Sequence, residues 1–109
     1  MKVSEIPYER ADAEKVCGVI DKAVEKINAA KSVDDVLEAR ELVNDALRDF
    51  YTESSLANAR FTLNTKDEFY SAEKDYYDEK MPVVQVSYLK YADAILRSKF
   101  LDELKTKIN

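Results

Sequence analysis

The chain has 109 residues, with 17 Lys and Arg against 22 Asp and Glu and a formal net charge of −5. This length suits one domain with a small core, and the negative charge argues against nucleic acid or an anionic membrane surface as a partner. The sequence has no histidine and one cysteine, which excludes Ser-His-Asp and Cys-His catalysis, HExxH zinc sites and an internal disulfide within these residues.

The first ten residues are predicted to form an extended lead-in. Pro7 disfavours helical backbone at the residue before it. Residues 1–10 mix both signs of charge and lack the apolar run of about 7 to 15 residues that a secretory signal needs. No apolar stretch approaches the ~20 residues that span a bilayer, and a lone cysteine suits a reducing compartment. We therefore expect a soluble, cytoplasmic protein.

A first helix is predicted over residues 11–31, where apolar side chains recur at steps of three and four. They are Ala13, Val16, Cys17, Ile20, Ala23, Val24, Ile27 and Ala30. Cys17 lies on this stripe and is predicted to pack as a small hydrophobe. Gly18 lies inside the helix, where glycine costs about 0.5–1 kcal/mol relative to alanine. Close packing against a neighbouring backbone and an incidental weak position are both open interpretations of Gly18.

A second helix is predicted over residues 33–63, because Ser32 and Asp35 resemble a capping box. Its length is roughly 46 Å at 1.5 Å per residue. Its apolar face includes Val36, Leu37, Val43, Ala46, Leu47, Phe50, Ala57 and Phe61. An acidic row at three- and four-residue spacing consists of Asp34, Glu38, Glu41 and Asp45. Metal sites in helical bundles use facing interior side chains, usually with histidine, so we interpret this row as a solvated acidic face.

A third helix is predicted over residues 66–97. Asn64 is expected to end the second helix in a left-handed conformation, and Thr65 with Glu68 forms a capping box for the third. Its apolar positions include Phe69, Ala72, Tyr76, Tyr77, Val83, Val84, Tyr88, Tyr91, Ile95 and Leu96. Pro82 removes a backbone hydrogen bond and clashes with the preceding turn. We expect a kink or a short break just before it.

A short last helix is predicted over residues 99–108, capped by Ser98. The connections between the long helices have two or three residues, so neighbouring helices are antiparallel. The predicted fold is all-α: one domain over residues 1–109, forming an elongated antiparallel three-helix up-down-up bundle with a proline-kinked third helix and a short C-terminal helix.

Adjacent aromatic residues on the second and third helices exceed what one core requires. Neighbours in a helix point about 100° apart, so both rings of a pair cannot lie on one narrow seam. Either the rings wrap a broad core and expose only hydroxyl groups, or some form a docking surface. The possible interaction surface consists of Tyr51, Tyr70, Tyr77 and Tyr88. Such a surface would make the isolated chain self-associate.

Four sequence features together resemble a known family. They are SEIPYER at residues 4–10, ANARFTLNT at residues 57–65, DEFY at residues 67–70, and an acidic and aromatic run to Asp78 and Pro82. Over nearly the whole chain they are similar to the amino-terminal helical region of oligoendopeptidase F-type zinc peptidases, relatives of thimet oligopeptidase. This resemblance implies a cytoplasmic peptidase that cuts short peptides inside a closed helical chamber, with an HExxH helix and a downstream glutamate holding zinc.

No position of this chain matches a catalytic or metal-ligating residue of that family. We therefore assign no catalytic, cofactor-binding or metal residue here, and expect zinc only in a catalytic region outside this chain. The leading hypothesis is a noncatalytic scaffold and chamber-wall domain, excised or truncated, whose partner is the remainder of a peptidase chain or a second copy. The alternative is a free-standing helical module for protein interaction or self-association. Neither hypothesis involves nucleic acid or a membrane.

Overall fold

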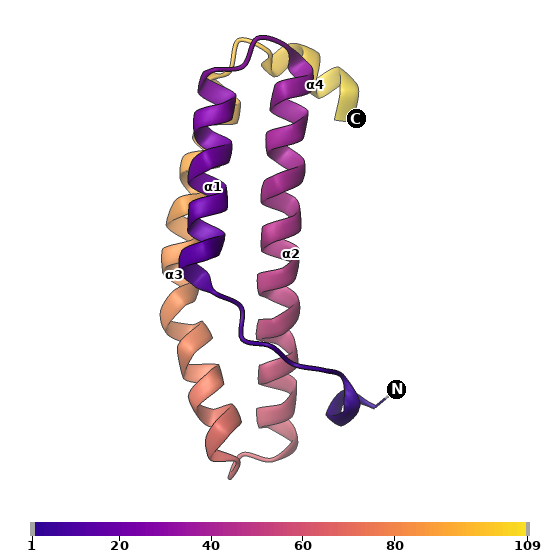
Figure 1. Ribbon diagram of the computed structural model, residues 1–109, viewed down its shortest axis with the longest axis vertical. Helices are drawn as coiled ribbons and strands as arrows, with labels where there is room; N and C mark the ends of the chain where they lie inside the picture. Colours follow the sequence, from indigo (N-terminus) through magenta and orange to yellow (C-terminus); the bar gives the residue numbers. More distant parts are fainter. Residues whose placement is uncertain (1, 109) are drawn as a thin grey trace.

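The computed structural model describes residues 2–108, which form helices and no strands. Three long helices lie side by side in an up-down-up arrangement, and a short fourth helix packs at one end (Figure 1). The elements are a 3-10 turn η1 (Val3–Glu5), α1 (Ala13–Asn28), α2 (Val33–Leu63), α3 (Glu68–Arg97) and α4 (Leu101–Ile108). The molecule measures 51 × 27 × 17 Å. The predicted elongated three-helix bundle with a short C-terminal helix is confirmed.

Helix α1 is shorter at both ends than the predicted 11–31. Asp12 is its N-cap, and the Asp12 carboxylate accepts a hydrogen bond from the backbone N–H of Lys15 at 3.2 Å. At the other end the Ala29 N–H still bonds to the Glu25 carbonyl, but Ala29 has left the helix. Ala30 is also buried, but it lies after the end of the helix. Apolar periodicity alone therefore overestimated the length of the helix.

Helix α2 spans the predicted residues 33–63, but its ends differ from the expected chemistry. Ser32 is the N-cap, yet its side chain makes no capping hydrogen bond. Instead, the Asp35 carboxylate accepts from the backbone N–H of Lys31 at 3.0 Å. Asn64 has a φ of −149°, so the left-handed end predicted there is wrong and the chain leaves α2 in an extended conformation.

Helix α3 starts at Glu68, two residues later than predicted, because Asp67 is its N-cap. The Asp67 carboxylate accepts from the Tyr70 N–H at 3.2 Å, so the predicted Thr65 capping box is wrong. The helix runs through Pro82 without the short break considered for that position. Figure 1 shows α3 bending along its length, which agrees with the predicted kink and not with a break. Buried residues on both sides of Pro82 hold the helix together across the proline.

Helix α4 starts at Leu101, two residues after the predicted start at residue 99. Ser98 ends α3 and shapes the turn that follows. The Ser98 hydroxyl accepts from the Phe100 N–H at 3.1 Å, and the Ser98 carbonyl accepts from the Leu101 N–H at 3.1 Å. Ser98 was predicted to cap the last helix, but its hydrogen bonds stabilise the turn before α4.

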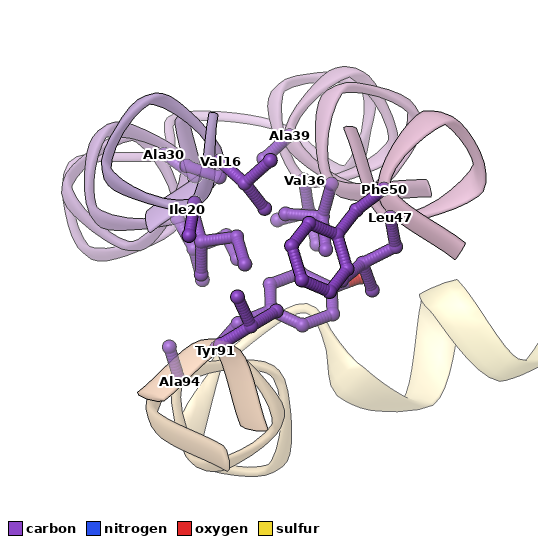
Figure 2. Close-up of a cluster of buried hydrophobic side chains, with 14 of the residues drawn as sticks. Val16, Ile20, Ala30, Val36, Ala39, Leu47, Phe50, Tyr91 and Ala94 are labelled. Atoms are coloured by element: carbon purple, nitrogen blue, oxygen red, sulfur yellow. The ribbon is translucent and has the colours of Figure 1, made fainter. Parts of the chain in front are cut away.

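The core lies along the axis between the three long helices (Figure 2). Phe50 of α2 is fully buried, as predicted, and its ring meets that of Tyr77 edge to face at 5.4 Å. Leu104 of α4 closes one end of the core. Cys17 is half-buried and packs against the margin of the core. A Cβ added at Gly18 would meet nothing within 4 Å, which favours the incidental weak position over close packing.

The lead-in takes the place of a third helix along half of the bundle. Helix α1 has 16 residues, whereas α2 has 31 and α3 has 30. The lead-in crosses α2 (Figure 1). There the Glu9 N–H donates to the Glu53 carboxylate at 3.2 Å, and Arg60 Nε donates to the Val3 carbonyl at 3.1 Å.

No helix among residues 2–108 has the length and apolar character needed to cross a membrane.

Candidate functional site

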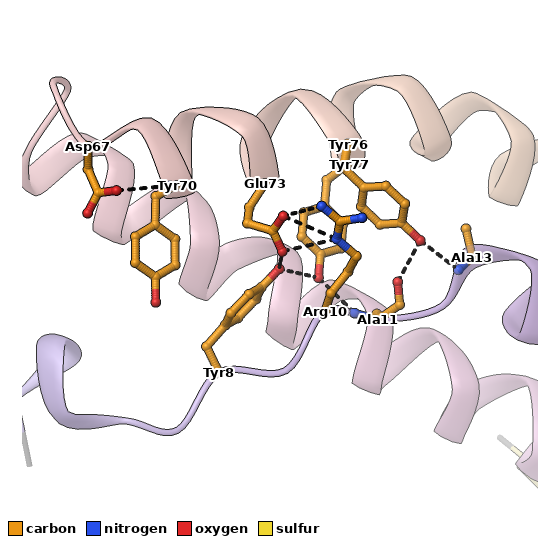
Figure 3. A network of polar contacts seen from close by, with 9 residues as sticks. All are labelled: Tyr8, Arg10, Ala11, Ala13, Asp67, Tyr70, Glu73, Tyr76 and Tyr77. Atoms are coloured by element: carbon orange, nitrogen blue, oxygen red, sulfur yellow. Dashed lines mark hydrogen bonds and ion pairs between the residues drawn. The ribbon is translucent and has the colours of Figure 1, made fainter.

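Residues 8–11 of the lead-in are held against α3 by a network of side chains, which we call the lead-in clamp: Tyr8, Arg10, Glu73, Tyr76 and Tyr77 (Figure 3). The Tyr8 hydroxyl donates to Glu73 Oε1 at 2.7 Å. Arg10 Nε lies 3.1 Å from both Glu73 carboxylate oxygens, and a second Arg10 nitrogen also pairs with Glu73. The clamp joins residues more than 60 positions apart in the sequence.

Glu73 is the buried charge of the lead-in clamp, with 3% of its surface exposed. A buried carboxylate is strongly destabilising unless it is paired and hydrogen-bonded. The hydrogen bonds from Arg10 lower the pKa of the Glu73 carboxyl, and the hydrogen bond from Tyr8 lowers it further against the raising effect of burial. Arg10 also stacks on the Tyr76 ring, with its guanidinium carbon 4.3 Å from the ring centroid. Glu73 therefore remains ionised in the folded protein at neutral pH.

The hydroxyl groups of Tyr76 and Tyr77 on α3 form hydrogen bonds with the backbone at the start of α1. The Ala11 N–H donates to the Tyr77 hydroxyl at 2.9 Å, and the Ala13 N–H donates to the Tyr76 hydroxyl at 3.0 Å. The Tyr76 hydroxyl in turn donates to the Ala11 carbonyl at 2.7 Å. These contacts satisfy backbone groups that a helix N-terminus leaves without intrahelical partners.

The proton positions in the clamp follow from its chemistry. An ionised carboxylate only accepts, so the single Tyr8 hydroxyl proton goes to Glu73. The 2.9 Å contact between the two hydroxyls is then a donation from Tyr77 to Tyr8. Burial raises the pKa of both Tyr8 and Tyr77, which keeps both phenols protonated. The clamp is a chain of donors that ends on one carboxylate.

The four tyrosines predicted as an interaction surface do not lie together. Tyr77 is 1% exposed and belongs to the core and the clamp. Tyr70 is half-buried, with its ring 5.7 Å from that of Tyr8. Tyr51 on α2 and Tyr88 on α3 are exposed. The structure therefore excludes Tyr77 as a surface residue and leaves Tyr51 and Tyr88 on separate helices.

Sequence reasoning missed the clamp residues Tyr8, Arg10 and Glu73. The available signal was a charge on an apolar helix face. Glu73 lies four residues before Tyr77, so the two share one face of α3. A carboxylate in that position requires a donor from elsewhere in the chain, and Arg10 in the lead-in supplies it.

Helix α3 carries a second apolar face that points away from the core. This outer stripe consists of Val83, Val86, Leu89 and Leu96, all exposed, with Leu89 at 65%. Val83, Val84, Tyr91 and Leu96 were all predicted as apolar positions of this helix, but only Val84 and Tyr91 lie in the core. Phe69 is likewise exposed. Exposed apolar residues gathered along a helix indicate an interaction surface.

The acidic row on α2 is exposed to solvent. Glu38 pairs with Lys26 of α1 at 2.9 Å, and Asp45 pairs with Arg48 at 3.1 Å. Among residues 2–108, no three His, Cys, Asp or Glu side chains are grouped so that they could hold a metal ion. The side chains described here do not fit a zinc site.

Comparison with known proteins gives a family match over almost the whole chain. The model described as the peptidase M3 N-terminal domain matches residues 3–109. No functionally curated protein matches the chain. The family resemblance expected from the sequence is confirmed.

Three solved structures share the fold. PZ peptidase A, solved with an inhibitor, is 33% identical and superimposes with a TM-score of 0.91 over 97% of this chain. A candidate oligoendopeptidase F from Bacillus anthracis strain Ames is 33% identical, with a TM-score of 0.89 over 95% of this chain. Another candidate oligoendopeptidase F is 34% identical, with a TM-score of 0.92 over 98%. The chain spans 19% of the length of each of these structures.

Proposed function

The chain belongs to the peptidase M3 N-terminal domain family, and from this premise we propose that it is a noncatalytic scaffold domain that forms part of the chamber wall of an oligoendopeptidase F-like zinc peptidase. The full-length form of such a protein hydrolyses short peptides. One observation carries the proposal: the match covers nearly all of this chain but about a fifth of each larger structure. Zinc and the catalytic residues belong to the remainder of such a protein, since no histidine is present in these 109 residues.

The outer stripe on α3 supports a role as one wall of a larger protein. Val86, Leu89 and Leu96 lie on the side of α3 away from the buried Val84 and Tyr91, and Val83 lies at the edge of that side. Burying apolar surface is worth on the order of 25 cal/mol per Å², so exposed side chains of this size favour a covering partner. In our proposal the stripe packs against the remainder of the peptidase chain.

The lead-in clamp supports the same role by fixing the shape of the domain. It holds residues 8–11 along α3 through charged and phenolic hydrogen bonds. A wall that contacts other parts of a protein needs a rigid surface, because a misplaced wall changes the chamber.

The cytoplasmic location is part of this proposal and rests on the single half-buried Cys17.

Self-association is the second candidate function, and the same outer stripe favours it. When no other partner is present, two copies can bury their α3 stripes against each other. This reading makes the chain a free-standing interaction module. The two hypotheses use the same surface but differ in the partner, which is a second copy here and the remainder of a peptidase chain in the scaffold hypothesis.

A chimaera tests the scaffold role. Residues 3–109 replace the matching region of PZ peptidase A, and hydrolysis of a quenched peptide is measured. The chimaera is expected to keep peptidase activity, and Leu89→Asp in the outer stripe is expected to reduce it more than tenfold. Asp75→Asn, an exposed change elsewhere on α3, is the control and is expected to have no effect.

Two results would overturn the scaffold proposal. One is a well-folded chimaera whose activity does not respond to Leu89→Asp. The other is peptide hydrolysis by the isolated 109-residue chain that survives repurification and metal-free controls. The second result would show that the chain is itself catalytic.

A further inference from the structure

A groove of about 480 Å³ runs between the lead-in, the first half of α1 and the middle of α2. None of its lining residues comes from α3, so it is separate from the outer stripe. Its floor is apolar: Val16, Val19, Leu42, Ala46 and Phe50. Leu42 is 49% exposed, although it sits beside the core. The bundle itself leaves Leu42 uncovered, whereas Val16 and Phe50 are buried beneath it.

The rim of the groove is acidic. Five carboxylates line it, against two basic side chains. The carboxylates are Glu9, Asp12, Asp45, Asp49 and Glu53. Of the basic pair, Arg10 is already paired with Glu73 in the clamp, which leaves Lys15 to face the carboxylates. Asp45 is likewise paired with Arg48. The four other carboxylates against Lys15 still give the rim an excess of negative charge.

The acidic and apolar side chains form parallel rows along α2. Leu42, Ala46 and Phe50 follow at steps of four residues. Asp45, Asp49 and Glu53 also follow at steps of four residues, and each comes three residues after a member of the apolar row. Residues four apart lie on one side of a helix, so the two rows run together for roughly 12 Å. The small side chain of Ala46 lets another backbone approach the floor closely.

The charge of the rim selects among possible occupants. A second copy of this chain carries a net charge of −5, so its acidic surfaces are repelled. Nucleic acid and anionic lipid are repelled for the same reason. An apolar row flanked by carboxylates is complementary to a helix with apolar residues at i, i+4 and i+7 and with Lys or Arg beside them.

We propose that this groove binds a basic amphipathic helix of a protein partner, which packs beside α1 and α2. The apolar side chains of the partner pack on Leu42 and Ala46. Its basic side chains pair with Asp49 and, in place of Arg48, with Asp45. This binding does not depend on the proposed peptidase role, and its test measures association and not hydrolysis.

The test uses the 109-residue chain and a fluorescent probe peptide of about 18 residues, with Leu at i, i+4, i+7 and i+11 and Lys at the flanking positions. Binding is measured by fluorescence anisotropy. Leu42→Lys and the double change Asp45→Asn with Asp49→Asn are each expected to weaken binding about tenfold or more. Raising the salt from about 0.05 to 0.3 M is expected to weaken binding of the probe to the unmodified chain.

Matched controls separate the groove from general attraction to an acidic protein. Leu89→Lys repeats the first change on α3, and the double change Asp75→Asn with Glu79→Gln removes two exposed carboxylates there. Both are expected to alter binding less than twofold. A probe with Glu in place of Lys is expected not to bind. Amide NMR shifts on adding the Lys probe are expected to cluster at the groove residues of α1 and α2.

Two outcomes would overturn the proposal. In one, the groove variants and the α3 variants weaken binding equally, which indicates attraction to net charge alone. In the other, the shifts lie on the outer stripe of α3. Circular dichroism of each variant shows whether the fold is intact, and the double Asp variant keeps the test valid if Leu42→Lys unfolds the chain.

Discussion

The hydroxyl of Tyr8 donates to the carboxylate of Glu73 at 2.7 Å, across 65 positions of sequence. This bond joins an irregular segment to the second turn of a 30-residue helix. It also places a buried charge where the lead-in, α1 and α3 meet (Figure 3). The stability of the lead-in therefore depends on a few side chains whose removal has predictable effects.

Tyr8→Phe is expected to destabilise the protein by about 1–3 kcal/mol. The change removes one donor to Glu73 and leaves the Tyr77 hydroxyl without its acceptor, and a buried group that loses its partner costs about this much. Chemical denaturation measures the loss. Tyr51→Phe, at an exposed ring, is the control and is expected to change the stability by less than about 0.5 kcal/mol. Equal effects of the two changes would contradict the clamp.

Arg10→Ala is expected to cost more than Glu73→Gln, about 2–3 against about 1 kcal/mol at neutral pH. Removing Arg10 leaves a carboxylate that is almost wholly buried, whereas removing the charge of Glu73 leaves a guanidinium that is half exposed and can be hydrated. Urea denaturation of both variants compares them. The opposite order would show that the burial of Glu73 without its partner is not the larger cost in free energy of unfolding.

The stability of the unmodified chain is expected to fall on acidification more steeply than that of Glu73→Gln. Hydrogen bonds from Arg10 lower the pKa of Glu73 in the folded state. The stabilisation is therefore complete above the unfolded pKa of a glutamate, about 4.3, and is lost as the pH falls through the folded pKa. Denaturation between about pH 6 and pH 2.5 measures the difference. Parallel pH profiles for the two proteins would count against an ionised Glu73.

Gly18→Ala is expected to stabilise the protein by about 0.5–1 kcal/mol. The new Cβ meets nothing within 4 Å, and alanine restricts the unfolded chain without straining the helix. Thermal unfolding detects the change as a higher Tm. Ala72→Gly, an exposed position within α3, is the matched control, with a similar effect of opposite sign. A loss of stability in Gly18→Ala would indicate a close neighbour.

Phe50→Ala is expected to cost about 3–5 kcal/mol. The ring is fully buried and packs edge to face on Tyr77, so its removal leaves a cavity between α2 and α3. Tyr51→Ala, one residue along but exposed, serves as the comparison and is expected to cost far less. A loss below about 1 kcal/mol for Phe50→Ala would mean that the core is placed wrongly.

The isolated chain is expected to form dimers or larger oligomers at high micromolar concentration, through the outer stripe of α3. Light scattering measures the molar mass. The double change Val86→Lys with Leu89→Lys is expected to restore a monomer, because it places charges on that stripe. Leu42→Lys, which changes the separate groove, is expected to leave the oligomer intact. A monomeric unmodified chain would leave no role for the stripe in self-association.

The sequence alone determined the helical elements and much of the core. Scarce glycine and proline and a steady period of three and four predicted three long helices, and α2 was predicted at its observed bounds of 33–63. Helix ends were less certain, because several nearby polar residues compete to cap one helix. Asp67 is the N-cap of α3 in place of the expected Thr65, since its carboxylate is the group that reaches the Tyr70 N–H.

Only the tertiary structure decided which rings are buried and what the lead-in does. Periodicity places a residue on a helix face but does not say which face meets which neighbour. Tyr77 therefore lay among the predicted surface tyrosines, although it is buried, while Val86 and Leu89 form an exposed stripe. The contact of Tyr8 and Arg10 with Glu73 depends on α1 being shorter than its neighbours, which opens a place beside α3 for the lead-in. Locally only Glu73 is conspicuous, as a charge on an apolar helix face. Its partners Tyr8 and Arg10 cannot be identified from sequence, because they meet Glu73 only after the helices have packed.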